Sequence, residues 1–220
     1  MDLDLKMLSQ NDPLNRYVER NEGGEIYSPF DPPAEPLVKE SMSYENMHPL
    51  LQSFIDEHEE IKKHIQLFDD AIQNVRKIGF TKDIYQAIRN FFESFDQKII
   101  PNMKREEKFL FLKLHERLIE IGEHSPSEPI QTGVTLLETE HTHVIQMGAV
   151  IFNFFALSWR LKDHEAKLQV LDLAIEKALQ LIEIIRLHSL REDTVLFPLA
   201  QKHLKPHEMT TLLEKRANDA

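Results

Sequence analysis

The chain has 220 residues, 41% hydrophobic and 29% charged, which is typical of a folded globular protein rather than of a disordered one. It contains no cysteine, which excludes disulfides, iron–sulfur clusters, cysteine-ligated zinc and a thiol nucleophile. The formal net charge of −11 disfavours nucleic-acid binding. The acidic start has no apolar signal-peptide core, and no uncharged apolar run is long enough to span a membrane. We therefore expect a cytoplasmic protein with no membrane partner.

Residues 1–47 differ in composition from the rest of the chain. Residues 21–36 read NEGGEIYSPFDPPAEP, and this density of Gly and Pro cannot sustain a helix. A short helix before it, at about residues 3–20, is the weaker alternative. We predict an extended N-terminal arm that wraps the domain or binds a protein partner, such as a second copy of the chain.

Residues 48–204 carry apolar side chains at three- and four-residue spacing, the pattern of amphipathic helices that face a core. Gly and Pro lie mostly at the boundaries between these helices. The predicted helices are His48 to about Lys77, about Lys82 to Ile121 with a kink at Pro101, about Ile130 to Leu161, and about His164 to His203. Residues 205–220 add a short C-terminal helix that begins at Pro206, followed by a tail.

Long amphipathic helices with short connections predict an all-α fold, an antiparallel up-down-up-down four-helix bundle over 48–204. Such bundles place metal ligands on facing helices at the centre of the core. Polar residues interrupt the apolar stripe of each of the four long predicted helices. They are His58 on the first helix, Glu106 on the second, His141 on the third, and His188 and Glu192 on the fourth.

These five residues suggest a metal site. A buried carboxylate or imidazole without a partner costs several kcal/mol, so buried charges are usually paired or bound to metals. His188 and Glu192 are four residues apart and therefore lie on one helix face. Without cysteine, imidazole and carboxylate ligands suit iron, manganese or zinc better than copper(I).

Residues 48–204 resemble the hemerythrin-like (HHE cation-binding) family. The resemblance is carried by His188-Ser-Leu-Arg-Glu192-Asp-Thr-Val-Leu-Phe-Pro-Leu, Pro101-Asn-Met-Lys-Arg-Glu106-Glu-Lys-Phe-Leu-Phe, Asp56-Glu57-His58-Glu59-Glu60-Ile61 and Glu140-His141-Thr-His-Val-Ile. It implies an iron cofactor of one or two ions, with two favoured. His58, His141 and His188 would be terminal ligands, and Glu106 and Glu192 would be bridging carboxylates.

The chain departs from the family pattern at position 102, where Asn stands in place of an expected histidine. Asn102 can offer a carbonyl oxygen, whereas its NH2 group cannot bind a metal. Water or a further carboxylate such as Glu107 could complete the ligand set. A two-ion site, a one-ion site and a bundle that has lost its metal all fit the sequence.

The resemblance implies a protein that binds or senses O2, or responds to iron. One alternative is an enzyme that reduces peroxide or nitric oxide at a diiron centre, so enzymatic activity stays open. Another is a metal-free structural or interaction bundle whose working part is the N-terminal arm. The family's cluster-repair members carry a cysteine-bearing domain, which this chain lacks.

Overall fold

The structure is a computed structural model that describes residues 43–126 and 128–219, so most of the predicted arm, and the alternative helix at about 3–20, lie outside the described residues. The described residues are almost entirely helical and contain no strand. Their elements are η1 (Tyr44–Asn46), α3 (Pro49–Ile78), α4 (Lys82–Ser94), η2 (Phe95–Ile99), α5 (Ile100–Glu106), η3 (Glu107–Phe111), α6 (Leu112–Glu120), α7 (Gly133–Arg160), α8 (His164–Arg191), η4 (Glu192–Leu196), α9 (Phe197–His203) and α10 (Pro206–Ala217).

Local chemistry accounts for the helix ends. The His48 ring caps α3 by accepting a hydrogen bond from the backbone N–H of Leu50, and Thr81 caps α4 by accepting from Ile84. Gly79 and Gly122 end their helical runs with φ of 72° and 78°, backbone angles that side chains disfavour. The predicted helix boundaries therefore agree with the structure to within a few residues.

Elements α4 to α6 form one helical run, and α8 to α9 form another. Both contain π-helical turns, at η2, η3 and η4. Two of these turns are followed, after one residue, by a proline. Ile100 and Phe197 each donate to the carbonyl five residues earlier, and Pro101 and Pro198, which lack an N–H, follow them. The interruption predicted at Pro101 thus takes the form of a π-helical turn, and the run continues through it.

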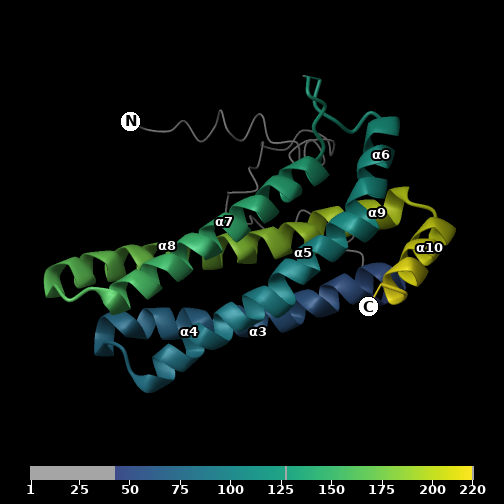
Figure 1. Cartoon of the computed structure of the whole chain (residues 1–220). Helices are drawn as coiled ribbons and strands as arrows, with labels where there is room; N and C mark the ends of the chain where they lie inside the picture. The colour runs from purple at the N-terminus through teal and green to yellow at the C-terminus, as the bar shows by residue number, and fades with distance from the viewer. Residues whose placement is uncertain (1–42, 127, 220) are drawn as a thin grey trace, which may run out of the picture.

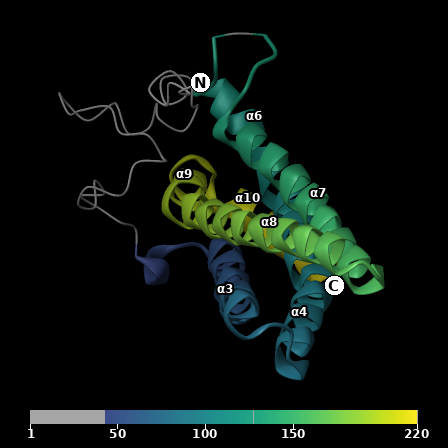
Figure 2. The ribbon, with the colours of Figure 1, turned by 90° about the vertical axis from the view of Figure 1, so that its left-hand side faces the viewer.

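The helices pack as two hairpins. Helix α3 lies along α4, α7 lies along α8, and α3 also contacts α8, as Figures 1 and 2 show. Helix α10 lies outside this arrangement and packs against α3 and η3 (Figure 1). Each hairpin brings an outgoing and a returning helix together, so every long helix contributes one face to the interior.

The buried apolar residues form two clusters rather than one. The first is built around Phe68, Phe91 and Phe155, and the second around Phe54, Phe111 and Phe197. The boundary between them falls at the predicted site. In α3, for example, Phe54 belongs to the second cluster, Ile61 to the first, and the buried His58 lies between them. A polar layer therefore crosses the apolar core.

One described helix, α7, has the length and composition to cross a membrane. This is weak evidence for a membrane span, because a core helix of a soluble protein passes the same test. Here α7 packs along α8 and carries buried residues on one face, including His141. The structure is compatible with a soluble protein.

Candidate metal centre

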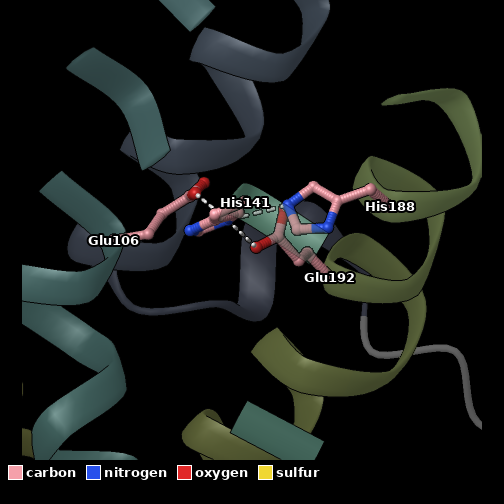
Figure 3. Close-up of side chains that lie close together, drawn as sticks. All are labelled: Glu106, His141, His188 and Glu192. Atoms are coloured by element: carbon pink, nitrogen blue, oxygen red, sulfur yellow. Dashed lines mark hydrogen bonds and ion pairs between the residues drawn. The ribbon is translucent and has the colours of Figure 1, made fainter. Parts of the chain in front are cut away.

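The polar layer brings together all five residues singled out in the sequence. Each is almost completely buried, with exposed fractions of 0% for Glu106 and Glu192, 1% for His58 and His141, and 3% for His188. Four of them, Glu106, His141, His188 and Glu192, each offer a ligand atom within 4.8 Å of the others (Figure 3). This buried group could hold a metal ion.

The closest approach in this group is between two histidines. The Nε2 atoms of His141 and His188 lie 2.9 Å apart. The same Nε2 of His188 lies 3.3 Å from Glu192 Oε2, and that of His141 lies 3.6 Å from Glu106 Oε2. Side chains from three helical runs thus direct nitrogen and oxygen atoms at one point.

His58 approaches the same carboxylates from α3. Its Nε2 lies 3.0 Å from Glu106 Oε1 and 3.2 Å from Glu192 Oε2. It does not belong to the group of four whose ligand atoms are mutually close. We call the group of Glu106, His141, His188 and Glu192 the His141 side, and the surroundings of His58 and Asn102 the His58 side.

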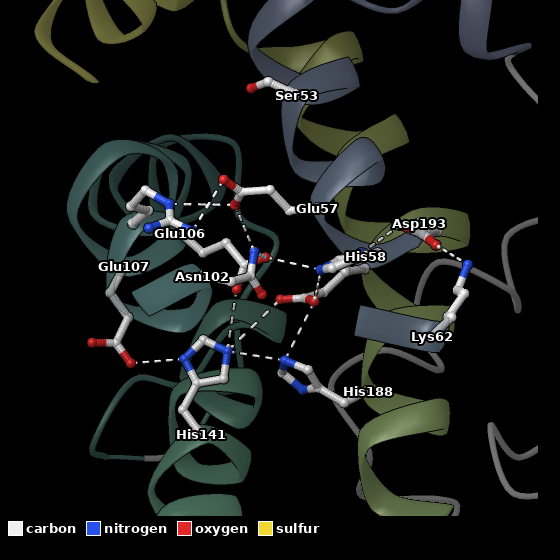
Figure 4. A network of polar contacts seen from close by, with 12 residues as sticks. Ser53, Glu57, His58, Lys62, Asn102, Glu106, Glu107, His141, His188 and Asp193 are labelled. Carbon is white, nitrogen blue, oxygen red and sulfur yellow. Dashed lines mark hydrogen bonds and ion pairs between the residues drawn. The ribbon is translucent and has the colours of Figure 1, made fainter. Parts of the chain in front are cut away.

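Every one of the three histidines has a carboxylate at its outer nitrogen. Nδ1 of His58 lies 2.8 Å from Asp193, that of His141 lies 2.7 Å from Glu107, and that of His188 lies 2.9 Å from Glu140 (Figure 4). A carboxylate at the outer nitrogen of a histidine fixes the ring's orientation and tautomer, leaving the inner nitrogen for a metal. These three carboxylates were not predicted as a set; only Glu107 was considered, and as a ligand. The sequence could have indicated them, because each is next to a proposed ligand. Glu107 follows Glu106, Glu140 precedes His141, and Asp193 follows Glu192.

Phenylalanine rings stack on two of the three imidazoles. Phe197 stacks on His58 with ring centroids 5.7 Å apart, and Phe111 stacks on His141 at 5.4 Å. Phe111 is the last residue of the π-helical turn η3, and Phe197 directly follows the turn η4. The outer carboxylates orient all three imidazoles, and the stacked rings further restrict His58 and His141.

The carboxylates of the layer have unsatisfied oxygens. Glu106 Oε2 and both carboxylate oxygens of Glu192 are buried and make no hydrogen bond. Such atoms cost free energy unless something pairs with them, and Glu192 has only imidazole nitrogens at 3.2–3.9 Å. A cation at the centre would satisfy them, so the donor set fits a bound metal.

The net charge of the surrounding side chains also favours a bound cation. Six carboxylates contact the three imidazoles or Asn102, and four Lys or Arg side chains contact these carboxylates, which leaves an excess of two negative charges. The carboxylates are Glu57, Glu106, Glu107, Glu140, Glu192 and Asp193, and the cations are Lys62, Arg105, Arg191 and Arg216. A divalent ion, or protons on the imidazoles, would balance this excess.

Without a metal, protons on the imidazoles balance the excess negative charge. Burial lowers the pKa of His188, but the charge of Glu192 and the hydrogen bond to Glu140 raise it to about 10. Burial also opposes a charge on His58, yet hydrogen bonds to Asp193 and Glu106 hold its pKa well above 6.5. Burial raises the pKa of Glu192, and the neighbouring imidazoles, His188 first, bring it well below 4.5. The metal-free centre therefore binds protons tightly.

Asn102 is buried beside the centre, but it presents its amide nitrogen. Nδ2 donates to Glu106 Oε1 at 2.9 Å and to Glu57 Oε2 at 3.1 Å. Two carboxylate oxygens thus accept from this group, and an NH2 group is not a metal ligand. Of the neighbouring histidines, His143 on α7 is exposed, and His64 on α3 contacts Lys98.

Comparisons of the chain with protein-family models, with curated proteins and with solved structures find no match. The geometry of the polar layer is therefore the main guide to the function of this chain.

Proposed function

We propose that this chain is a hemerythrin-like, non-haem iron-binding protein that binds or senses O2, or responds to iron, through the buried His/Glu layer. The proposal includes the up-down-up-down bundle topology, which the two packed hairpins support. The observation that carries it is the convergence of three imidazole Nε2 atoms on two buried carboxylates with unpaired oxygens.

The spacing of His141 and His188 supports a metal site. With Glu107 and Glu140 next to the Nδ1 atoms, the Nε2 atoms of the two rings face each other at 2.9 Å, and the proton that His188 holds in the metal-free protein bridges them. Ligand atoms about 2.1 Å from one ion and at a right angle to each other lie roughly 3 Å apart. The distance between the two rings would therefore suit two ligands of one ion.

The ligand types narrow the choice of metal. Imidazole suits zinc, copper, iron and nickel, whereas carboxylate suits harder ions, so a mixed set of two His and two Glu without sulfur fits iron well. Glu106, His141, His188 and Glu192 would hold such an ion. Iron with vacant positions supplies the capacity to react with O2.

This chain's own residues would control access to such a centre. The apolar clusters on both sides of the layer exclude bulk water, and the outer carboxylates hold the imidazoles in place before an ion arrives. The cytoplasmic location and a partner bound through residues 1–47 stay predictions from the sequence.

The test is the metal content of protein purified from iron-supplied cells, together with its optical spectrum in the reduced state before and after exposure to O2. We expect close to one or more iron ions per chain and a spectral change on oxygenation. E192Q should lose iron, whereas E165Q, which removes an exposed carboxylate on the same helical run, should not. Wild-type protein with well under one metal ion per chain would support the metal-free bundle instead.

A further inference from the structure

The two sides of the polar layer are not equivalent. The His141 side supplies two imidazoles and a carboxylate oxygen from each of Glu106 and Glu192, all mutually close. The His58 side supplies one imidazole and must share the same two carboxylates. A second ion would need further ligands, and Asn102 occupies the position from which one would come.

Asn102 disfavours the binding of a second ion on the His58 side. Glu106 Oε1, the oxygen that faces the His58 side, already accepts a hydrogen bond from Asn102 Nδ2 at 2.9 Å and lies 3.0 Å from His58 Nε2. A carboxylate oxygen that already accepts from an amide N–H has less capacity left to bind a cation. The amide of Asn102 thus occupies an acceptor that the second ion would require.

Glu57 is the nearest carboxylate that could replace the missing ligand, and it is held away. Its Oε1 accepts from Arg216 at 2.6 Å and lies 3.0 Å from Arg105, while its Oε2 accepts from Asn102. Two guanidinium groups around one carboxylate leave a net positive charge next to the His58 side. That charge disfavours a further cation there.

Arg216 comes from α10, the helix outside the two hairpins. It also donates to Ser53 at 2.7 Å and lies over the Phe54 ring at 4.3 Å, so α3 holds it in place. Figure 4 shows the resulting connection from Glu57 of α3 through Asn102 to Glu106. The C-terminal helix therefore reaches the edge of the metal centre through one side chain.

We propose that the centre holds a single metal ion per chain, on the His141 side, and that Asn102, with Glu57 held by Arg216 of α10, closes the His58 side to a second ion. This inference rests on the proposed function, since it needs a metal centre. It adds the stoichiometry of the site and assigns a controlling role to a helix that contributes no ligand.

The first experiment titrates the metal-free full-length protein with ferrous ion under argon, using a chromophoric chelator as competitor. We expect one tightly bound equivalent, with any second equivalent weaker by at least a hundredfold. Two equivalents of similar affinity would overturn this inference and leave the proposed function standing. Failure to bind any ion would overturn both.

Two variants test the closing network. N102D keeps the size of the side chain but replaces the donor with a ligand, and R216Q releases Glu57; each should allow a second ferrous equivalent to bind. K215Q, an exposed neighbour on α10, should bind one ion as wild type does. If both N102D and R216Q fold, as judged by circular dichroism, and still bind one ion, the network does not close the site. Should N102D fail to fold, R216Q and the wild-type stoichiometry decide.

Discussion

His141 and His188 come from neighbouring helices of one hairpin, and their Nε2 atoms lie 2.9 Å apart between two buried carboxylates. Each ring is fixed from outside, His141 by Glu107 and His188 by Glu140. The pair is therefore arranged before any ion binds, which lowers the entropic cost of binding. Most of the expected behaviour of the protein follows from this relationship.

Loss of either imidazole should weaken metal binding strongly. H141Q or H188Q removes a ligand nitrogen while keeping a polar side chain, and we expect the metal Kd to rise by more than the 10- to 100-fold typical of outer-sphere changes. H143Q is the matched control, because His143 is exposed two residues further along α7. A competition titration with a chelator measures the Kd. Wild-type affinity in H141Q would remove that residue from the site.

We expect removal of an outer carboxylate to weaken metal binding more strongly when that carboxylate is more buried. Glu140 is 19% exposed and also pairs with Arg191, whereas Glu107 is 42% exposed. Water can replace Glu107 more easily, so E140Q should weaken metal binding by about 10- to 100-fold and E107Q by less. E138Q, at an exposed position on α7, serves as the control. An equal loss in E107Q and E140Q would contradict this ranking.

The sequence was sufficient to predict most of the helices and the location of the polar layer. Amphipathic spacing is a local signal, and capping residues such as Thr81 mark the ends directly. The five layer residues stood out because each interrupts an apolar stripe. Burial of all five in one layer is the outcome that this pattern predicted.

Other features depend on contacts between distant segments and could not be predicted. Asn102 could have turned either end of its amide to the centre, and only Glu57 together with Glu106 determines that the nitrogen faces them. Arg216 lies 159 positions from Glu57, and no periodic pattern relates them. The π-helical turns were missed as well, although Phe109, Leu110 and Phe111 are all buried in succession, which a regular α-helix turning by about 100° per residue does not favour.

Gly148 on α7 should resist substitution despite its helical position. A β-carbon there would overlap Cζ of Phe95 and lie 2.8 Å from its Cε1, and Phe95 begins the η2 turn. Helix propensity alone predicts that G148A stabilises the protein by about 1 kcal/mol. We expect the opposite, a loss of about 1–3 kcal/mol from overpacking, measured by urea denaturation. A149G at the exposed neighbour measures the propensity contribution separately.

The metal-free protein should lose stability as pH rises above neutrality. The pKa of His188 is about 10 in the folded protein against an ordinary 6.5, so the folded state holds this proton more tightly than the unfolded state. Its contribution is fully present below pH 6.5 and disappears as pH rises through about 10. The lowered pKa of Glu192 acts in the opposite direction, and its contribution is lost as pH falls below 4.5.

Urea denaturation in the presence of a chelator, at several pH values between 6 and 10, tests this expectation. The free energy of unfolding of the wild type should fall across that range, and H188Q should show a shallower fall because the titrating group is gone. Metal binding displaces the same protons, so metal affinity should rise with pH over the range in which the metal-free protein weakens. Parallel pH profiles for wild type and H188Q would mean that the proton is held elsewhere in the layer, since His58 has a raised pKa as well.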